Sequence, residues 1–431
     1  MKRRIFPALA LLPLMLLGSA QARLTIQVTG GVEGAQPIAV VPFESRGLAL
    51  SEDVSAIIAA DLARTGRFRA MPRRDMLATP SRPEDVDLRD WSLLGMVNLV
   101  IGEVKAGGGG GYEINYTLFD VYKGDQLVSQ SVPATAAGLR LAAHRIADEV
   151  YERLTGTPGV FATRIAYVTS VRQQGGRTRT ILKVADSDGH GPLTIVSSPE
   201  PIMSPAWSPD GRRIAYVSFE NRRPAIYVQD LVSGRRDLVA SFDGINSSPA
   251  FSPDGSKLAM TLSKEGSPDI FVLDLVSRQL SRITDHYAID TEPSWSPDGS
   301  HIIFTSDRGG SPQIYKVGSL GGPVQRLTFE NDYNGRASYS PDGRYITLVT
   351  RVNGQFRIGL LDLDRRYTRV LSRGKLDESP SFAPNGGMVI YATQHNGRGV
   401  LAATPINGGV GQRLSQDSGE VREPAWSPFL R

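Results

Sequence analysis

A seven-residue phrase that returns about every 44 residues constrains the fold of this chain more than any other feature. Its first copy reads Pro-Ala-Trp-Ser-Pro-Asp-Gly and ends at Gly211. The proline at the fifth place of the phrase recurs at positions 209, 253, 297, 341, 384 and 428, so the steps are 44, 44, 44, 43 and 44 residues. A period in the forties with strand-like content indicates a β-propeller with one copy of the phrase in each blade.

The residues of the phrase match the needs of such a blade. Pro-Asp-Gly forms a tight turn, because Pro fixes φ, Asp bonds its own backbone and Gly tolerates a positive φ. The aromatic residue, Trp207 in the first copy, is expected to fill the seam between neighbouring blades. A second apolar strand follows each turn, as at Arg213–Val217, and a third and a short fourth strand come after it.

The repeated phrase and the second strand that follows it do not begin and end together along the chain, and this offset predicts how the ring closes. The earliest strand of the second-strand type, Arg164–Val168, has no phrase before it. The last phrase, Pro424–Pro428, has no second strand after it. We therefore expect Glu423–Pro428 to supply the innermost strand of the first blade. Such pairing removes open sheet edges and gives six blades, favoured here over five or seven.

The amino terminus has the pattern of a secretory signal peptide over residues 1–22. Three basic residues precede the apolar run Ile5–Leu17 and the Ala20-Gln-Ala22 cleavage site. This run is shorter than the roughly 20 residues of a transmembrane helix. Removing it lowers the formal net charge from +4 to +1, which gives no reason to expect a nucleic-acid partner. The mature chain should then begin with a mobile arm over residues 23–34.

An α/β domain is predicted over residues 35–158, with the propeller over residues 159–431. We expect Ser51 to cap a helix that ends at Gly66, and Gly107–Gly111 to form a hairpin tip. The other expected elements are strands at Pro37–Phe43, Val97–Lys105 and Tyr112–Leu118 and helices at Asp90–Leu94 and Leu139–Gly156. Thr157–Gly159 is the expected hinge into the propeller.

The sequence contains no recognisable catalytic or metal-binding motif. It lacks Gly-x-Ser-x-Gly and His-Glu-x-x-His, and it has no cysteine for disulfides or a thiolate metal site. The five histidines have no ligand-like spacing, and we place His144 on the polar side of its helix. We therefore predict no enzyme activity, no catalytic residue and no cofactor, although a cation could occupy the propeller channel.

Binding is expected at the short segments that lead into each first strand, because these differ between blades while the strands repeat. They are polar or acidic and should ring one mouth of the channel, at residues 201–204, 246–248, 290–292, 334–336, 377–379 and 422–423. A docking face for a protein is the favoured interpretation. The alternatives are an exported hydrolase or lyase and a propeller that binds carbohydrate or peptidoglycan, but these segments have almost no aromatic residues for stacking on sugars.

The combined motifs resemble the TolB family, the periplasmic propellers of the Tol-Pal cell-envelope system of Gram-negative bacteria. The likeness is carried by Pro37–Phe43, Met203–Gly211, Phe304–Asp307 and Pro424–Pro428, beside the signal peptide. It implies a non-enzymatic periplasmic hub for protein–protein interactions that supports outer-membrane integrity and envelope constriction at cell division. It also implies a monomer without a transmembrane segment, peripheral to the outer membrane.

The resemblance further implies two partners, with other envelope proteins as further candidates. The lipoprotein Pal is expected at the channel mouth, on Thr291 and Glu292 and on Asn246 and Ser248, in a set that also takes in Met203, Ser204, Arg336, Glu378 and Glu423. The protein TolA is expected to engage the mature amino-terminal arm, at Arg23, Leu24, Thr25, Ile26, Gln27 and Val28.

Overall fold

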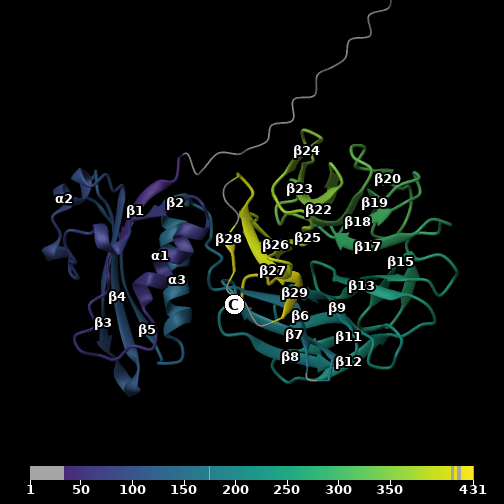
Figure 1. The fold of residues 1–431 in the computed structure, drawn as a ribbon, viewed down its shortest axis with the longest axis horizontal. Helices are drawn as coiled ribbons and strands as arrows, with labels where there is room; N and C mark the ends of the chain where they lie inside the picture. Colours follow the sequence, from purple (N-terminus) through teal and green to yellow (C-terminus); the bar gives the residue numbers. More distant parts are fainter. Residues whose placement is uncertain (1–33, 174, 409–411, 415–418, 431) are drawn as a thin grey trace, which may run out of the picture.

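The computed structural model describes residues 34–173, 175–408, 412–414 and 419–430. The predicted signal peptide and the arm, apart from Gly34, lie outside these ranges, and so do the proposed TolA-binding residues Arg23–Val28. The described chain forms an α/β domain followed by a β-propeller, as the sequence predicted (Figure 1).

The α/β domain is built on one five-stranded mixed sheet. Its strand order is β2-β1-β3-β4-β5, with bounds Phe68–Ala70, Gln36–Val40, Asn98–Ala106, Tyr112–Asp120 and Gln126–Ala134. Strand β1 runs parallel to β2 and β3, while β3, β4 and β5 pair antiparallel. Helices α1 (Val54–Arg64) and α3 (Leu139–Thr155) bury their apolar stripes against one face, and α2 (Leu88–Leu93) lies over a second cluster around Trp91. Short 3₁₀ turns occupy Arg73–Asp75, Pro83–Asp85 and Gly108–Gly110.

The helix ends show one position where the local sequence prediction fails and one where it holds. The prediction that Ser51 caps the first helix is wrong: α1 begins at Val54, and the Asp53 carboxylate accepts a hydrogen bond from the Ala56 N–H at 3.0 Å. An N-cap side chain must lie directly before the first helical residue to reach these N–H groups, and Ser51 stands too early. Gly156 ends α3 with φ 70°, the left-handed cap that the sequence indicated.

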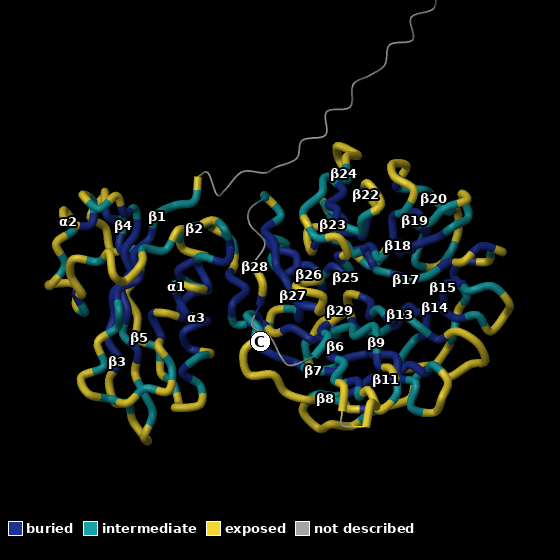
Figure 2. Tube along the Cα trace, viewed as in Figure 1, coloured by how far each residue is buried: buried dark blue, intermediate teal, exposed yellow. Residues whose placement is uncertain are grey.

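Within the described residues the propeller consists of six four-stranded sheets arranged around a channel. From the inner to the outer strand, the first blade has β29 (Glu420–Trp426), β6 (Arg164–Arg172), β7 (Thr178–Asp186) and β8 (Leu193–Ser198), and the second has β9 (Ile202–Trp207), β10 (Arg213–Ser218), β11 (Ala225–Asp230) and β12 (Arg236–Ala240). The third blade has β13 (Asn246–Phe251), β14 (Lys257–Leu262), β15 (Asp269–Asp274) and β16 (Leu280–Arg282), and the fourth has β17 (Asp290–Trp295), β18 (His301–Ser306), β19 (Gln313–Gly318) and β20 (Gln325–Arg326). The fifth blade has β21 (Asn334–Tyr339), β22 (Tyr345–Val352), β23 (Gln355–Asp362) and β24 (Tyr367–Val370), and the sixth has β25 (Glu378–Phe382), β26 (Met388–His395), β27 (Arg398–Pro405) and β28 (Gln412–Arg413). Figure 2 shows buried strands running through the centre of the blades, with exposed turns around them.

The ring closes between the two ends of the propeller, as the offset between the phrases and the second strands predicted. Strand β29 pairs antiparallel with β6, with Trp426 opposite Ile165. The Arg164 N–H also donates to the Ser427 hydroxyl at 3.0 Å, which extends the seal by one residue. The first blade therefore combines strands that lie about as far apart in sequence as the propeller allows.

The repeated aromatic residues fill the seams between blades. The indole N–H of Trp207 donates to the Ala425 carbonyl at 3.0 Å, and that of Trp295 donates to the Ala250 carbonyl at 3.0 Å. Each bond joins one inner strand to that of the preceding blade. Because a buried indole N–H needs an acceptor, the seam is fixed in register as well as filled.

Polar contacts join the two domains. Helices α1 and α3 lie between the α/β sheet and the propeller (Figure 1). The Arg64 guanidinium on α1 donates to the Ser187 hydroxyl on the β7–β8 turn at 2.9 Å, and the Asn385 amide donates to the Pro158 carbonyl at 2.8 Å. Among the described residues, none of the helices combines the length and apolar character needed to cross a membrane.

Candidate functional site

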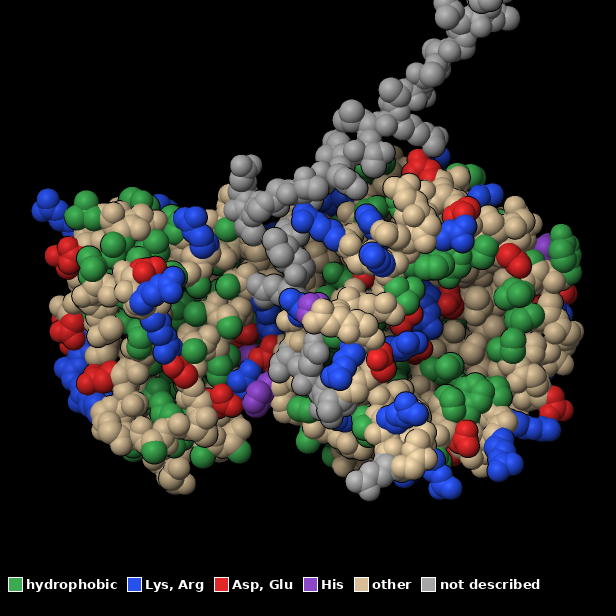
Figure 3. Space-filling model, in the orientation of Figure 1, with side chains coloured by type: hydrophobic (Ala, Val, Ile, Leu, Met, Phe, Trp, Pro, Cys, Tyr) green, Lys and Arg blue, Asp and Glu red, His purple; other side chains and the backbone are tan. Residues whose placement is uncertain are grey.

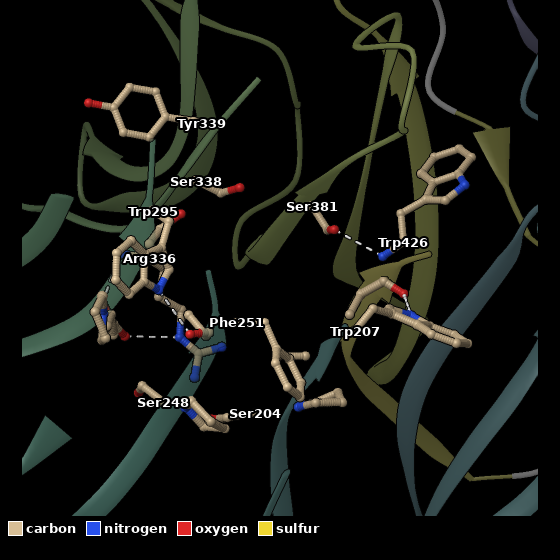
Figure 4. A pocket seen from close by; sticks show the side chains of 18 of the residues that line it. Ser204, Trp207, Ser248, Phe251, Trp295, Arg336, Ser338, Tyr339, Ser381 and Trp426 are labelled. Atoms are coloured by element: carbon tan, nitrogen blue, oxygen red, sulfur yellow. Dashed lines mark hydrogen bonds and ion pairs between the residues drawn. The ribbon is translucent and has the colours of Figure 1, made fainter. Parts of the chain in front are cut away.

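The inner strands of all six blades surround a channel pocket of about 440 Å³. Its wall is made of the repeated phrase and the residue before it (Figure 4). The prediction that variable loops carry the binding residues is wrong in one respect: Thr291 and Glu292 lie inside strand β17, and the other segments likewise fall mostly within first strands. A proline follows five of the six segments, Ala337 being the exception, and it hid this because it breaks the alternating pattern by which strands are recognised.

One residue in each inner strand adopts a left-handed backbone conformation, and together these form what we call the bulge ring. Each stands directly before the repeated phrase, where the strand register shifts. Their φ angles lie between 50° and 57°, at Ser204, Ser248, Glu292, Arg336, Ser379 and Glu423. Such a conformation costs a non-glycine residue about 1–3 kcal/mol and persists where surrounding contacts impose it, often at functional sites. Six strained residues at one repeat position therefore mark the channel as a candidate site.

Side chains of the bulge ring form a connected charged network. The Arg336 side chain donates from Nε to Glu292 Oε1 at 3.0 Å and to the Ser379 hydroxyl, and its Nη2 lies 3.6 Å from Glu423 Oε1. Glu292 Oε2 accepts from the Arg336 N–H at 2.8 Å and from the Thr305 hydroxyl at 2.8 Å. Figure 4 shows the Arg336 guanidinium in the open space of the pocket, with Ser204 and Ser248 from other blades close by.

Arg336 is the electrostatic centre of this network. Burial disfavours its charged form, but the carboxylates of Glu423 and Glu292 outweigh burial and raise the pKa of Arg336 above its ordinary value. The bulge ring thus holds two carboxylates and one guanidinium, for a net charge of −1. Since 32% of the Arg336 side chain remains exposed to the channel, a partner's charged or hydrogen-bonding group can reach it.

Exposed apolar side chains lie on three consecutive blades, at the face of the propeller where the inner strands begin. We call them the apolar rim; they lie on the loops before β13, β17 and β21, at Phe242, Ile245, Tyr287, Ile289 and Phe329. Tyr287 is 86% exposed and Phe329 is 72% exposed. The His286 ring stacks on Tyr287 with 4.3 Å between centroids. Large exposed apolar groups rimming a polar centre are typical of protein-binding surfaces.

Sequence reasoning missed the apolar rim. It examined only the short segments next to the first strands, which have few aromatic residues, whereas the rim lies a few residues upstream. A usable signal was present: a large apolar residue such as Phe242 or Phe329 stands between two short strands where the expected fold offers no core to bury it.

The predicted Pal-binding residues divide into two groups in the structure. Ser204, Ser248, Glu292, Arg336 and Glu423 come together in the bulge ring. The rest lie outside it: Met203 packs against an interblade core, Thr291 contacts the Thr261 hydroxyl at 3.4 Å, and Glu378 begins β25, from where its charge also helps to raise the pKa of Arg336.

Asn246 is buried and supports a neighbouring loop instead of being exposed to a partner. Its side chain is fully buried, its Oδ1 accepts from the Phe242 N–H at 2.9 Å, and its Nδ2 donates to the Phe242 carbonyl at 2.7 Å. This amide therefore holds the loop that presents Phe242 and Ile245.

Comparisons with known proteins agree with these features. Residues 151–430 match the model described as the TolB beta propeller domain, and residues 24–127 match the TolB amino-terminal domain. The Tol-Pal system protein TolB of Nitrosococcus oceani is 63% identical over 410 residues, which cover 95% of this chain and 94% of that protein. The same-named protein of Thioalkalivibrio sulfidiphilus is 61% identical over 433 residues, covering 100% of this chain and 99% of that one. A crystal structure of TolB from Acinetobacter baumannii superposes with a TM-score of 0.85 at 42% identity, covering 92% of this chain and 97% of that one.

Proposed function

This chain belongs to the TolB family of the Tol-Pal system, and from that membership we propose that it acts in the periplasm as a non-catalytic hub for envelope proteins. In this proposal the lipoprotein Pal docks on the mouth of the propeller channel, and TolA engages residues 23–28. Joining the two partners supports outer-membrane integrity and envelope constriction at cell division. The chain works as a monomer and is held near the outer membrane through Pal.

The observation that carries the Pal site is the apolar rim, which lies at the same face of the propeller as the start of the inner strands that carry the bulge ring. The rim offers Tyr287 and Phe329 for burial against a partner, and the ring offers Arg336 and two carboxylates for polar contacts. Protein interfaces combine an apolar anchor with specific polar groups in this way, and the anchor residues usually supply most of the affinity.

The support for TolA binding is narrower. It rests on the match of residues 24–127 to the TolB amino-terminal domain, a range that includes nearly all of the predicted arm. The motif Leu24-Thr-Ile-Gln-Val28 alternates apolar and polar residues, as a segment that adds a strand to a partner's sheet would.

A carbohydrate partner is the second candidate, because the apolar rim supplies the aromatic residues that the short segments lacked. Tyr287 and Phe329 expose ring faces that could stack on the sugars of peptidoglycan. They lie on loops of different blades, however, and Ile289, two residues after Tyr287, is also exposed, so the surface offers apolar groups besides the rings, which suits a protein partner better.

Photo-crosslinking tests the proposal. A photoreactive phenylalanine analogue placed at Tyr287 should link the protein to Pal in intact cells. The same analogue at Val276, which is 87% exposed on a turn at the opposite face, should not. Crosslinks to Pal from both positions, or from neither, would contradict docking at this mouth, and a link to peptidoglycan fragments would favour the second candidate.

A further inference from the structure

A cluster of ionisable side chains lies at the junction of the two domains, far from the channel. His144 on α3 is 1% exposed, so the prediction that it lies on the polar side of its helix is wrong. A ring nitrogen of His144 and carboxylate oxygens of Asp186 and Asp188 lie within 4.8 Å of one another. The two aspartates belong to β7 and the turn after it, so the cluster joins the α/β domain to the propeller. Figure 3 shows acidic, basic and histidine side chains gathered along this junction.

The hydrogen bonds around His144 determine which ring nitrogen carries the hydrogen and which one is left with a lone pair. Its Nδ1 lies 2.6 Å from Asp61 Oδ2, and Asp61 Oδ1 lies 2.9 Å from the Arg64 guanidinium. A carboxylate held by an arginine acts as an acceptor, so Nδ1 carries the hydrogen and donates it. The Nε2 atom of His144 is buried and has no hydrogen-bond partner among the described residues. A neutral ring would therefore direct a lone pair toward two carboxylates.

The local charge balance also calls for a cation. The aspartates Asp61, Asp186 and Asp188 face the two guanidinium groups of Arg64 and Arg140. Arg140 also lies 3.2 Å from Glu52 Oε2, so its charge is shared among several carboxylates. Four carboxylates and two guanidinium groups leave a net charge of −2 at the junction before any charge on His144.

We propose that His144, Asp186 and Asp188 bind one zinc ion that bridges α3 and the β7–β8 turn and so fastens the two domains together. His144 Nε2 supplies the nitrogen ligand, the aspartates supply oxygens, and water completes the tetrahedron. Asp61 then has the role of an outer carboxylate that fixes the imidazole tautomer and orients the ring.

The chemical nature of the three ligand atoms indicates which metal ion the site would bind. One imidazole nitrogen with two carboxylate oxygens suits zinc, whereas magnesium and calcium take oxygen ligands almost alone. Zinc–ligand bonds of about 2.0–2.2 Å require donor atoms closer together than 4.8 Å. Binding must therefore draw the β7–β8 turn toward α3. No fixed spacing in the sequence could have shown this site, because its ligands come from two domains.

The test uses the whole mature chain, freed of metal with a chelator and titrated with zinc by calorimetry at neutral pH. We expect one zinc per chain and, at a 100-fold excess over the dissociation constant, a rise of about 3–5 °C in melting temperature. His144→Gln and Asp188→Asn should abolish this binding. Asp61→Asn should weaken it by about 10–100-fold, as expected for an outer partner of a metal ligand.

Two controls keep the result decisive. His395→Gln removes an exposed histidine at the end of β26 and should bind zinc as the parent chain does. If His144→Gln unfolds, Asp188→Asn with an unchanged melting temperature in chelator carries the test. Failure of the parent chain to bind zinc, or equal binding by parent and Asp188→Asn, would overturn the proposal.

Discussion

Arg336 and Glu292 should be coupled energetically as well as geometrically. The perturbation is a double-mutant cycle of Arg336→Met, Glu292→Gln and the double variant, since both replacements keep the approximate shape of the side chains. The bond from Arg336 Nε to Glu292 Oε1 is 3.0 Å long and joins groups of opposite charge. Hydrogen bonds to charged groups contribute about 1.5–3 kcal/mol, but channel water reaches roughly a third of Arg336 and screens the pair. We therefore expect a coupling free energy of about 1–2 kcal/mol.

Urea unfolding of the four proteins gives this coupling. Arg336→Met should be the more damaging single change, because it leaves both Glu292 and Glu423 without their cation. The exposed pair Arg351–Asp332 provides the matched control, and its coupling should be smaller than that of Arg336–Glu292 because solvent screens both charges. A coupling at Arg336–Glu292 below about 0.5 kcal/mol would show that the two residues act independently and would refute the bulge ring as a connected network.

Three further predictions concern stability. Trp426→Ala should lower the free energy of unfolding by about 3–5 kcal/mol, because it empties the closing seam and frees the acceptor Thr163; a melting temperature equal to the parent's would contradict the closure. Gly156→Ala should cost about 1–2 kcal/mol in urea unfolding because φ is 70°, whereas Gly108→Ala, at a hairpin tip without a positive φ, should be nearly neutral. Burial raises the pKa of Asp148 to about 6 despite N–H donors from Phe161 and Ala162, so the folded state holds this proton longer than the unfolded state. Stability should then fall by up to about 3 kcal/mol as the pH rises from about 4 to 6, and a chain with Asp148→Asn should lose this part of the slope.

The architecture followed from the sequence because repetition encodes it. Each copy of the phrase contains the residues of its own turn and its own seam residue. The unmatched strands at Arg164 and Trp426 leave one way to close the ring. The main helices of the α/β domain could also be predicted, since Gly156 and their apolar faces follow local rules, but strands β2 and β5 were not predicted. The cap at Asp53 was missed because two candidate residues, Ser51 and Asp53, stand close together.

The candidate sites were less predictable because they depend on contacts between blades and domains. The dipeptides Ser204-Pro205 and Glu292-Pro293 do not by themselves predict a β-bulge with a left-handed residue. The bulge arises only when the strand pairs with its neighbour. The apolar rim is assembled from three separate loops. The cluster at His144 brings together residues from α1, α3 and the β7–β8 turn, so each appears alone in the sequence as an ordinary charged side chain.

The affinity for the soluble domain of Pal tests the central claim most directly. Calorimetry should compare the parent chain with Tyr287→Ser on the apolar rim and with Val276→Ser on the opposite face, two sites of nearly equal exposure at 86% and 87%. The account predicts that Tyr287→Ser weakens binding by about 30-fold or more, as the loss of an interface anchor does, and that Val276→Ser leaves it unchanged. Equal affinities for all three proteins would place Pal elsewhere and contradict the account.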